Sequence, residues 1–84
     1  MIIECYRIPL QDWDKTDSEI KKEANKVLIP LNRIEYICSA THNPNRAEIL
    51  LSADKRLHVL ASYEEMLAKI ENLGETTHIM NRLD

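Results

Sequence analysis

Five apolar side chains recur at helical spacing near the end of the chain, and they constrain the fold more than any other feature. They are Tyr63, Met66, Leu67, Ile70 and Leu73. On an α-helix this spacing places them along a single stripe. Ser62 and Glu65 have the spacing of a capping box, and Gly74 stands where a left-handed C-terminal cap would lie. A short helix of this kind is held mainly by packing, so the rest of the chain must supply an apolar surface.

The preceding residues predict that this surface is a sheet. Residues 2–10 are rich in β-branched and aromatic side chains, and apolar residues alternate along 27–40. Residues 47–52 and 57–61 are further strand candidates, separated by the polar turn 53–56, and 41–46 is a turn by composition. Pro30 lacks a ladder donor, which favours an edge strand or a bend. The predicted fold class is α+β, a small antiparallel β-meander packed by the C-terminal amphipathic helix.

The polar segment 11–26 has two interpretations. Thr16 and Glu19 have capping-box spacing, and Ile20, Ala24 and Val27 recur at helical intervals. These features predict a short helix within 16–27. The alternative is a solvated excursion between two strands, since the segment has few apolar anchors.

The length of 84 residues supports one domain, 1–84. The chain has no Phe and one Trp, so any core must be built from aliphatic side chains. A small aliphatic core often gains burial by self-association, and we therefore expect a homo-oligomer. In the tail 75–84, Ile79, Met80 and Leu83 lie at near-helical spacing. The tail either docks on the domain or on a neighbouring subunit, or it frays.

The formal net charge of −3 argues against a protein that coats nucleic acid or anionic membrane. No apolar run approaches the length of a membrane span. Cys5 and Cys38 are the only cysteines, and with no signal-peptide pattern they predict buried hydrophobic residues rather than a secreted disulfide framework. A disulfide or metal role is the alternative. We expect a cytoplasmic protein.

Four blocks of sequence occur in an order that is characteristic of a known family. They are residues 34–37 (Ile-Glu-Tyr-Ile), 48–51 (Glu-Ile-Leu-Leu), 57–59 (Leu-His-Val) and 62–65 (Ser-Tyr-Glu-Glu). Over residues 27–72 this order resembles the flagellar FlbD family of small bacterial proteins, which implies a strand, turn, strand and capped-helix arrangement. The chain departs from the family in the 11–26 segment and in the turn at 54–56, where the family usually has a glycine. The order is also loosely similar to LytTR DNA-binding domains.

The residues that most often carry chemistry show no motif spacing. His42, His58 and His78 could join Cys5 and Cys38 around zinc only if separate elements converged, because no C-x-x-C or H-x-x-x-H pair is present. Nothing local activates either thiol for catalysis. A single glycine excludes the known phosphate-binding loops. We therefore predict no catalytic, metal-binding or cofactor-binding residues.

Basic residues provide the other candidate site. Arg33, Lys55 and Arg56 are predicted to lie in turns, where they would gather at one end of the sheet and contact nucleic acid. The alternative is a charged surface that keeps the sheet edges from pairing, because no aromatic residues are interleaved with these cations for base stacking.

Three functions follow in order of preference. The first is a non-enzymatic protein–protein interaction or oligomerisation module that uses a sheet edge or a helix face. The second is a nucleic-acid-binding regulator that uses Arg33, Lys55 and Arg56. The third is a small enzyme or ligand-binding subunit with a site formed between protomers.

Overall fold

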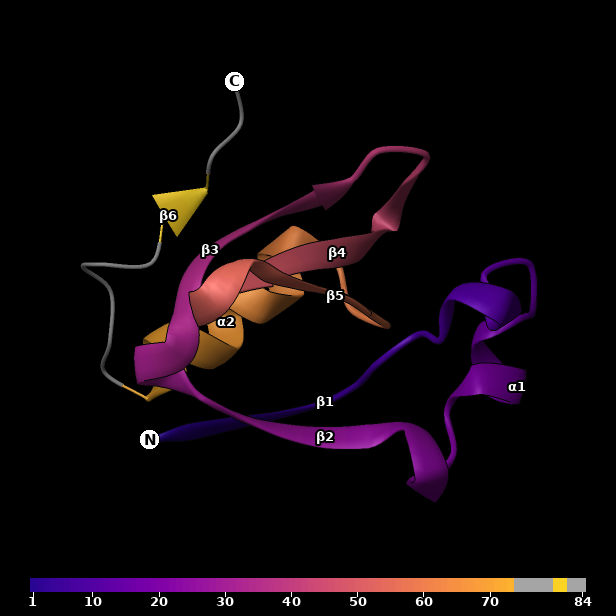
Figure 1. Cartoon of the computed structure of the whole chain (residues 1–84), viewed down its shortest axis with the longest axis horizontal. Helices are drawn as coiled ribbons and strands as arrows, with labels where there is room; N and C mark the ends of the chain where they lie inside the picture. Colours follow the sequence, from indigo (N-terminus) through magenta and orange to yellow (C-terminus); the bar gives the residue numbers. More distant parts are fainter. Residues whose placement is uncertain (74–79, 82–84) are drawn as a thin grey trace.

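Residues 1–73 and 80–81 are described by a computed structural model of the chain. They form the predicted α+β fold, with two mainly antiparallel sheets and a C-terminal helix (Figure 1). The tail 75–84, apart from residues 80–81, lies outside the described residues. Gly74, the predicted cap of the last helix, also lies outside them. No helix in the described ranges has the length and apolarity to cross a membrane.

The strands form two sheets rather than one meander. β1 (Ile2–Tyr6) pairs antiparallel with β2 (Lys26–Pro30) in a two-stranded ribbon. The second sheet has the order β5-β4-β3-β6. Its strands are β3 (Ile34–Ala40), β4 (Asn43–Leu51), β5 (Lys55–Val59) and β6 (Met80–Asn81), which runs parallel to β3. A bridge between Arg7 and Val59 connects the ribbon to β5.

Two predicted turns are shorter than the sequence suggested. The turn predicted over 41–46 is only Thr41–His42, because Ala40 pairs with Asn43 and closes a two-residue hairpin. The turn predicted over 53–56 is a 3₁₀ turn, Ser52–Asp54, and β5 begins at Lys55. Residues of types common in turns therefore form the beginning of β4 (43–46) and the beginning of β5 (55–56). Lys55 and Arg56, which were predicted to lie in a turn, are strand residues.

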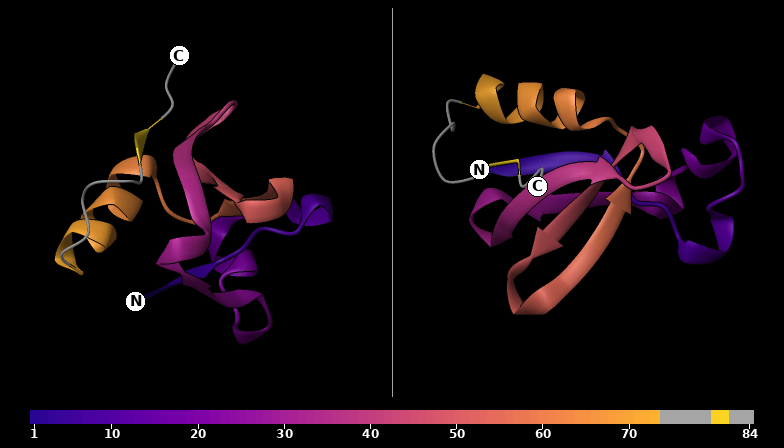
Figure 2. Two further views of the ribbon diagram at one scale, coloured as in Figure 1. Left: turned by 60° about the vertical axis from the view of Figure 1, so that its left-hand side comes forward. Right: turned by 90° about the horizontal axis from the view of Figure 1, so that it is seen from above.

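The C-terminal helix α2 (Tyr63–Asn72) packs against the strands as its apolar stripe predicts. Its capping box is present, since Glu65 N donates to Ser62 Oγ at 3.1 Å and Ser62 N donates to Glu65 Oε1 at 2.9 Å. Met66 and Ile70 are fully buried, whereas Leu67 is only partly buried. Figure 2 shows α2 on one side of the strands and the β4–β5 hairpin extending away on the opposite side.

The main hydrophobic core joins the β1–β2 ribbon, the larger sheet and α2. Nearly all of its side chains are aliphatic, as the absence of Phe requires. We call this cluster the main core; it comprises Ile3, Cys5, Ile29, Leu31, Ile34, Ile37, Ala47, Ile49, Val59, Ala61, Met66 and Ile70.

The polar segment between β1 and β2 folds as a series of short helical turns. Leu10–Asp12 is a 3₁₀ turn, α1 (Asp17–Ile20) follows, and Glu23–Asn25 is a second 3₁₀ turn. The predicted capping box is present, because Glu19 N donates to Thr16 Oγ1 and Thr16 N donates to Glu19 Oε1. The helix ends at Ile20, although the helical periodicity extended to Val27, because Lys26–Pro30 is paired with β1 as β2.

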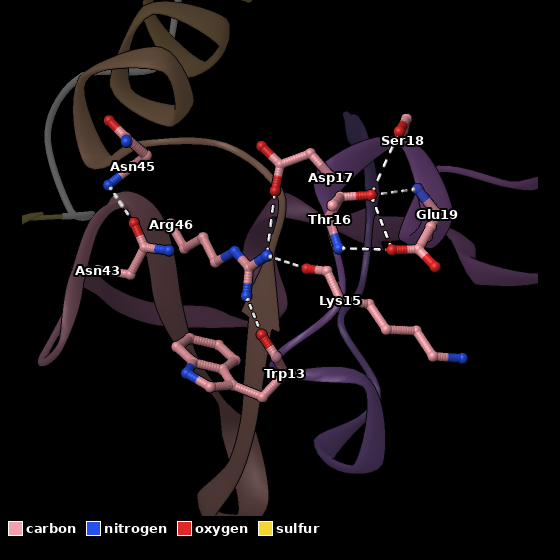
Figure 3. Close-up of polar contacts among 9 residues, drawn as sticks. All are labelled: Trp13, Lys15, Thr16, Asp17, Ser18, Glu19, Asn43, Asn45 and Arg46. Carbon is pink, nitrogen blue, oxygen red and sulfur yellow. Dashed lines mark hydrogen bonds and ion pairs between the residues drawn. The ribbon is translucent and has the colours of Figure 1, made fainter.

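Arg46 of β4 fastens this segment to the larger sheet (Figure 3). Its guanidinium is buried and donates to the carbonyl oxygens of Trp13 at 2.8 Å and Lys15 at 3.1 Å, and to Asp17 Oδ1 at 3.0 Å. The guanidinium carbon also lies 4.8 Å from the centre of the Trp13 ring, a cation–π distance. We call these four residues the Arg46 cluster. Ile8, Ile20 and Ala40 are buried outside the main core.

Candidate functional site

The outer edge of β2 offers unpaired backbone groups. β2 pairs only with β1 among the described strands, which confirms the edge strand that Pro30 predicted. Leu31 N donates to Met1 O, and the ladder register pairs Ile3 with Ile29 and Glu4 with Leu28. Because alternate pairs of an antiparallel ladder exchange hydrogen bonds, the backbone groups of Leu28 point away from β1.

The same alternation defines what the whole edge presents. The backbone groups of Lys26 and Pro30 are also directed away from β1, but the Lys26 N–H already donates to Glu23 O, and Pro30 has no N–H. The Leu28 side chain is 60% exposed on the outer face of the ribbon. The Ile2 side chain on β1 shares that face and is 55% exposed. β2 therefore presents an accessible edge together with exposed apolar side chains.

A hollow of about 300 Å³ lies between this edge and the β4–β5 hairpin, and we call it the edge hollow. Apolar side chains from three strands make most of its surface. Val27, Leu51 and Leu57 are partly buried and pack against the main core, so the hollow exposes the apolar layer that covers the core. The residues that line the hollow are Val27, Leu28, Ile29, Pro30, Arg33, Leu51, Lys55 and Leu57.

Two of the three predicted site residues line the edge hollow together. Arg33 follows β2 in the 3₁₀ turn Leu31–Arg33, and Lys55 begins β5. Neither forms an ion pair with a described residue, and none of the residues that line the hollow is acidic. Lys26 nearby differs, since its Nζ lies 3.3 Å from Glu23 and 3.9 Å from Glu4. Among the residues that the structure describes, the two positive charges of Arg33 and Lys55 therefore have no carboxylate partner.

Arg56, the third predicted residue, does not join them. Successive residues of a strand point to opposite faces, and Arg56 follows Lys55 directly in β5. Its guanidinium instead lies 3.4 Å from Glu48 Oε2, on the face of the sheet opposite the edge hollow. Predicting a turn over 53–56 concealed this alternation, and a predicted strand would have revealed it.

A row of side chains of the types that often take part in catalysis crosses the face of the sheet that carries Arg56. Cys38, Glu48 and His58 are paired across β3, β4 and β5. The Cys38 thiol lies 3.8 Å from Glu48 Oε1, and His58 Nε2 lies 3.9 Å from Glu48 Oε2. An imidazole activates a cysteine nucleophile from within hydrogen-bond distance, but here the carboxylate separates the two. Burial, and then Glu48, raise the pKa of Cys38, which disfavours the thiolate.

The two cysteines occupy different environments, and one departs from the prediction. Cys5 is buried in the main core as predicted, and burial raises the pKa of its thiol to about 11. Cys38 is only partly buried, because it lies on the outer face beside Glu48. Cys5 also borders a hollow of about 330 Å³ whose lining includes Lys21, Lys69 and Glu65. That lining contains both positive and negative side chains, so it does not favour a ligand of either charge.

The histidines are separated among the described residues. His42 is exposed in the turn Thr41–His42, and His58 is on β5, where its ring lies 5.2 Å from the Trp13 ring in an edge arrangement. His78 lies outside the described residues. Within 1–73 and 80–81, no group of three His, Cys, Asp or Glu side chains is arranged to hold a metal ion.

The comparisons with known proteins identify no relative. No family model matches the chain, no curated protein matches it, and no solved structure matches its fold. The function must therefore be argued from the geometry of the edge of β2 and the edge hollow.

Proposed function

We propose that this protein is a non-enzymatic interaction module that binds an extended segment of another protein along the free edge of β2. The observation that carries the proposal is an unpaired edge strand with an exposed Leu28 beside an apolar hollow. The free thiols of Cys5 and Cys38 suit a reducing compartment such as the cytoplasm.

Strand addition would use the backbone groups that β2 leaves free. A segment that pairs with this edge receives a hydrogen bond from the N–H group of Leu28, and donates to the carbonyl oxygens that point outward. Main-chain hydrogen bonds of this kind provide affinity, and pockets for alternate side chains provide specificity. The edge hollow is such a pocket, at the lower end of the volume range of ligand sites.

A second copy of the chain is the competing occupant, and it would produce the homo-oligomer expected from the sequence. Two β2 edges related by a twofold axis at Leu28 would exchange hydrogen bonds between their two Leu28 residues. β2 itself carries no acidic residue. In that register Glu23 of the second copy falls opposite Arg33, but this carboxylate already lies 3.3 Å from Lys26 Nζ, and the paired strands supply no carboxylate for Lys55. The charge of the hollow therefore favours a different protein over a second copy.

The decisive experiment selects random peptides displayed on phage against the immobilised full-length chain, and against its Leu28→Pro variant. Proline at position 28 removes an outward N–H and leaves the hydrogen bonds between β2 and β1 in place. We expect the wild-type chain to enrich a set of related peptides that bind the variant at least about tenfold more weakly, a loss typical of a central interface position.

Matched variants distinguish a loss of binding at the edge of β2 from a loss of folding. Ile29→Pro removes an N–H that belongs to the β1 ladder, so it should lower the unfolding temperature, whereas Leu28→Pro should not. Leu10→Ser alters a leucine that is 79% exposed and lies outside the edge hollow, and it should bind the selected peptides normally. The proposal is wrong if selection enriches no peptides, or if Leu28→Pro binds them as the wild type does.

A further inference from the structure

The edge hollow specifies the chemistry of the segment it receives, an inference that rests on the proposed function. We infer that the partner segment is an acidic strand, with two apolar side chains two residues apart and carboxylates at the next positions along the same face. The apolar side chains enter the hollow, and the carboxylates meet Arg33 and Lys55.

The spacing of the apolar residues follows from the ladder. A segment residue opposite Leu28 forms a hydrogen-bonded pair and points its side chain to the outer face, as Leu28 does. Segment residues opposite Val27 and Ile29 point to the other face, which is the face that borders the hollow. These two positions are separated by one residue, so the apolar side chains of the partner must alternate.

The sign of the partner's charge follows from the cations. The whole chain has a net charge of −3, yet the residues that line the hollow include Arg33 and Lys55 and no carboxylate. Lys26 at the same edge is already paired with Glu23 and Glu4, so it contributes little to the attraction. Complementary charge across an interface governs partner choice and association rate, and two uncompensated cations therefore select an acidic segment.

The same cations were candidates for contacting nucleic acid, but the lining of the hollow favours a peptide. Its remaining side chains are aliphatic residues and Pro30. Single-stranded nucleic acids are held by aromatic stacking platforms along a positively charged groove, and the hollow has no aromatic lining residue. Alternate leucine-like side chains fill such a hollow better than a nucleotide does.

Fluorescence anisotropy with two labelled synthetic peptides tests the inference on the full chain. One peptide has the sequence Glu-Thr-Leu-Thr-Leu-Thr-Glu, which places both glutamates on the face of the leucines. The other has lysine in place of each glutamate. We expect the glutamate peptide to bind at least about tenfold more tightly at low salt, and its affinity to fall as salt is raised. Arg33→Glu and Lys55→Glu should each weaken it by about fivefold or more, and the double variant should prefer the lysine peptide.

Lys22→Glu provides the control, because Lys22 is exposed and does not line the hollow. It changes the net charge by the same amount and should leave the peptide preference unchanged. The inference is overturned if the two peptides bind equally, if Lys22→Glu has the effect of Lys55→Glu, or if a single-stranded oligonucleotide displaces the glutamate peptide. Phage selection that depends on Leu28 but yields peptides without acidic residues would retain the proposed function and reject this inference alone.

Discussion

α2 and the segment from Leu10 to Ile20 both lie against the larger sheet, but different forces hold them there. α2 buries Met66 and Ile70 in the main core, so its attachment is apolar. The segment from Leu10 to Ile20 also buries one apolar side chain, Ile20, but its polar attachment is the buried guanidinium of Arg46, which donates to two backbone carbonyl groups and to Asp17. Apolar attachment tolerates small shifts, whereas the guanidinium depends on the geometry of a few hydrogen bonds. The two regions should therefore respond differently to substitution.

The largest effect should come from placing a charge in the apolar attachment. Ile70→Asp buries an unpaired carboxylate in the main core, which should cost about 4 kcal/mol or more and leave a chain of this size unfolded at 25 °C. Leu67→Asp on the same helix is the matched variant, and it should lose less because Leu67 is only partly buried. Circular dichroism during urea titration measures both. Equal losses would contradict the assignment of the buried stripe.

Arg46→Met should destabilise the polar attachment by about 2–3 kcal/mol, because the carbonyl groups of Trp13 and Lys15 lose a charged donor. Asp17→Ala should lower stability by less than about 1 kcal/mol, because the Asp17 side chain is 69% exposed. Urea unfolding followed by Trp13 fluorescence reports both changes. If Asp17→Ala had the larger effect, the ion pair and not the carbonyl contacts would hold the segment.

Alkaline pH should weaken the main core through Cys5. Burial raises the pKa of this thiol from 9.0 to about 11, so the folded chain retains a proton that the unfolded chain releases. The stabilisation is complete below pH 9.0 and is lost as pH rises through about 11, by at most about 1.4 kcal/mol per pH unit. Cys5→Ala should flatten this slope, and Cys38→Ala should change it less. Identical slopes for the wild type and Cys5→Ala would contradict the prediction.

Each of the two regions contains a capping box, so the contribution of the same type of contact to stability can be compared between them. Ser62→Ala removes the cap of α2 and should cost about 1 kcal/mol of global stability. Thr16→Ala removes the equivalent contact from α1, which has only four residues, and should cost about half as much. Thermal unfolding of both variants provides the comparison. A larger loss for Thr16→Ala would mean that α1 contributes more to the fold than its length suggests.

The connection between β4 and β5 belongs to neither of these regions, and it contains a strained backbone conformation. Ala53 has a φ of 67°, a left-handed conformation that is unfavourable for a residue with a Cβ atom. Ala53→Gly should therefore raise stability by about 0.5 kcal/mol, the relief of strain less the added chain entropy. Chemical denaturation would show a higher midpoint at an unchanged slope. A lower midpoint would mean that the turn tolerates Ala53 without strain.

The sequence predicted the parts of the fold that depend on local patterns. Both capping boxes, the apolar stripe of α2 and the edge position signalled by Pro30 could be recognised in short windows. The Arg46 cluster could not, because Arg46 and Trp13 are distant in the chain and meet only after the strands pair. The β4–β5 connection was predicted too long, since turn-forming residues also occur inside strands.

The candidate site was likewise predicted from the sequence only in part. Arg33 and Lys55 were identified as cations near the end of the sheet, and the structure places both at the edge hollow. Arg56 was grouped with them because side-chain alternation cannot be applied to a segment predicted as a turn. The walls of the hollow were missed, because Val27, Leu51 and Leu57 come from three strands and no local pattern reports their convergence.

Pro30 has one more consequence, for the length of chain that β2 can accommodate. Pro30 has no N–H at one end of the outward row, and at the other end the Lys26 N–H already donates to Glu23 O. Within β2, an added strand therefore receives a backbone hydrogen bond from Leu28 alone. Many exposed edges invite endless stacking of like chains. Because this edge offers few backbone groups, it favours the binding of one short segment over the repeated addition of chains into a fibre.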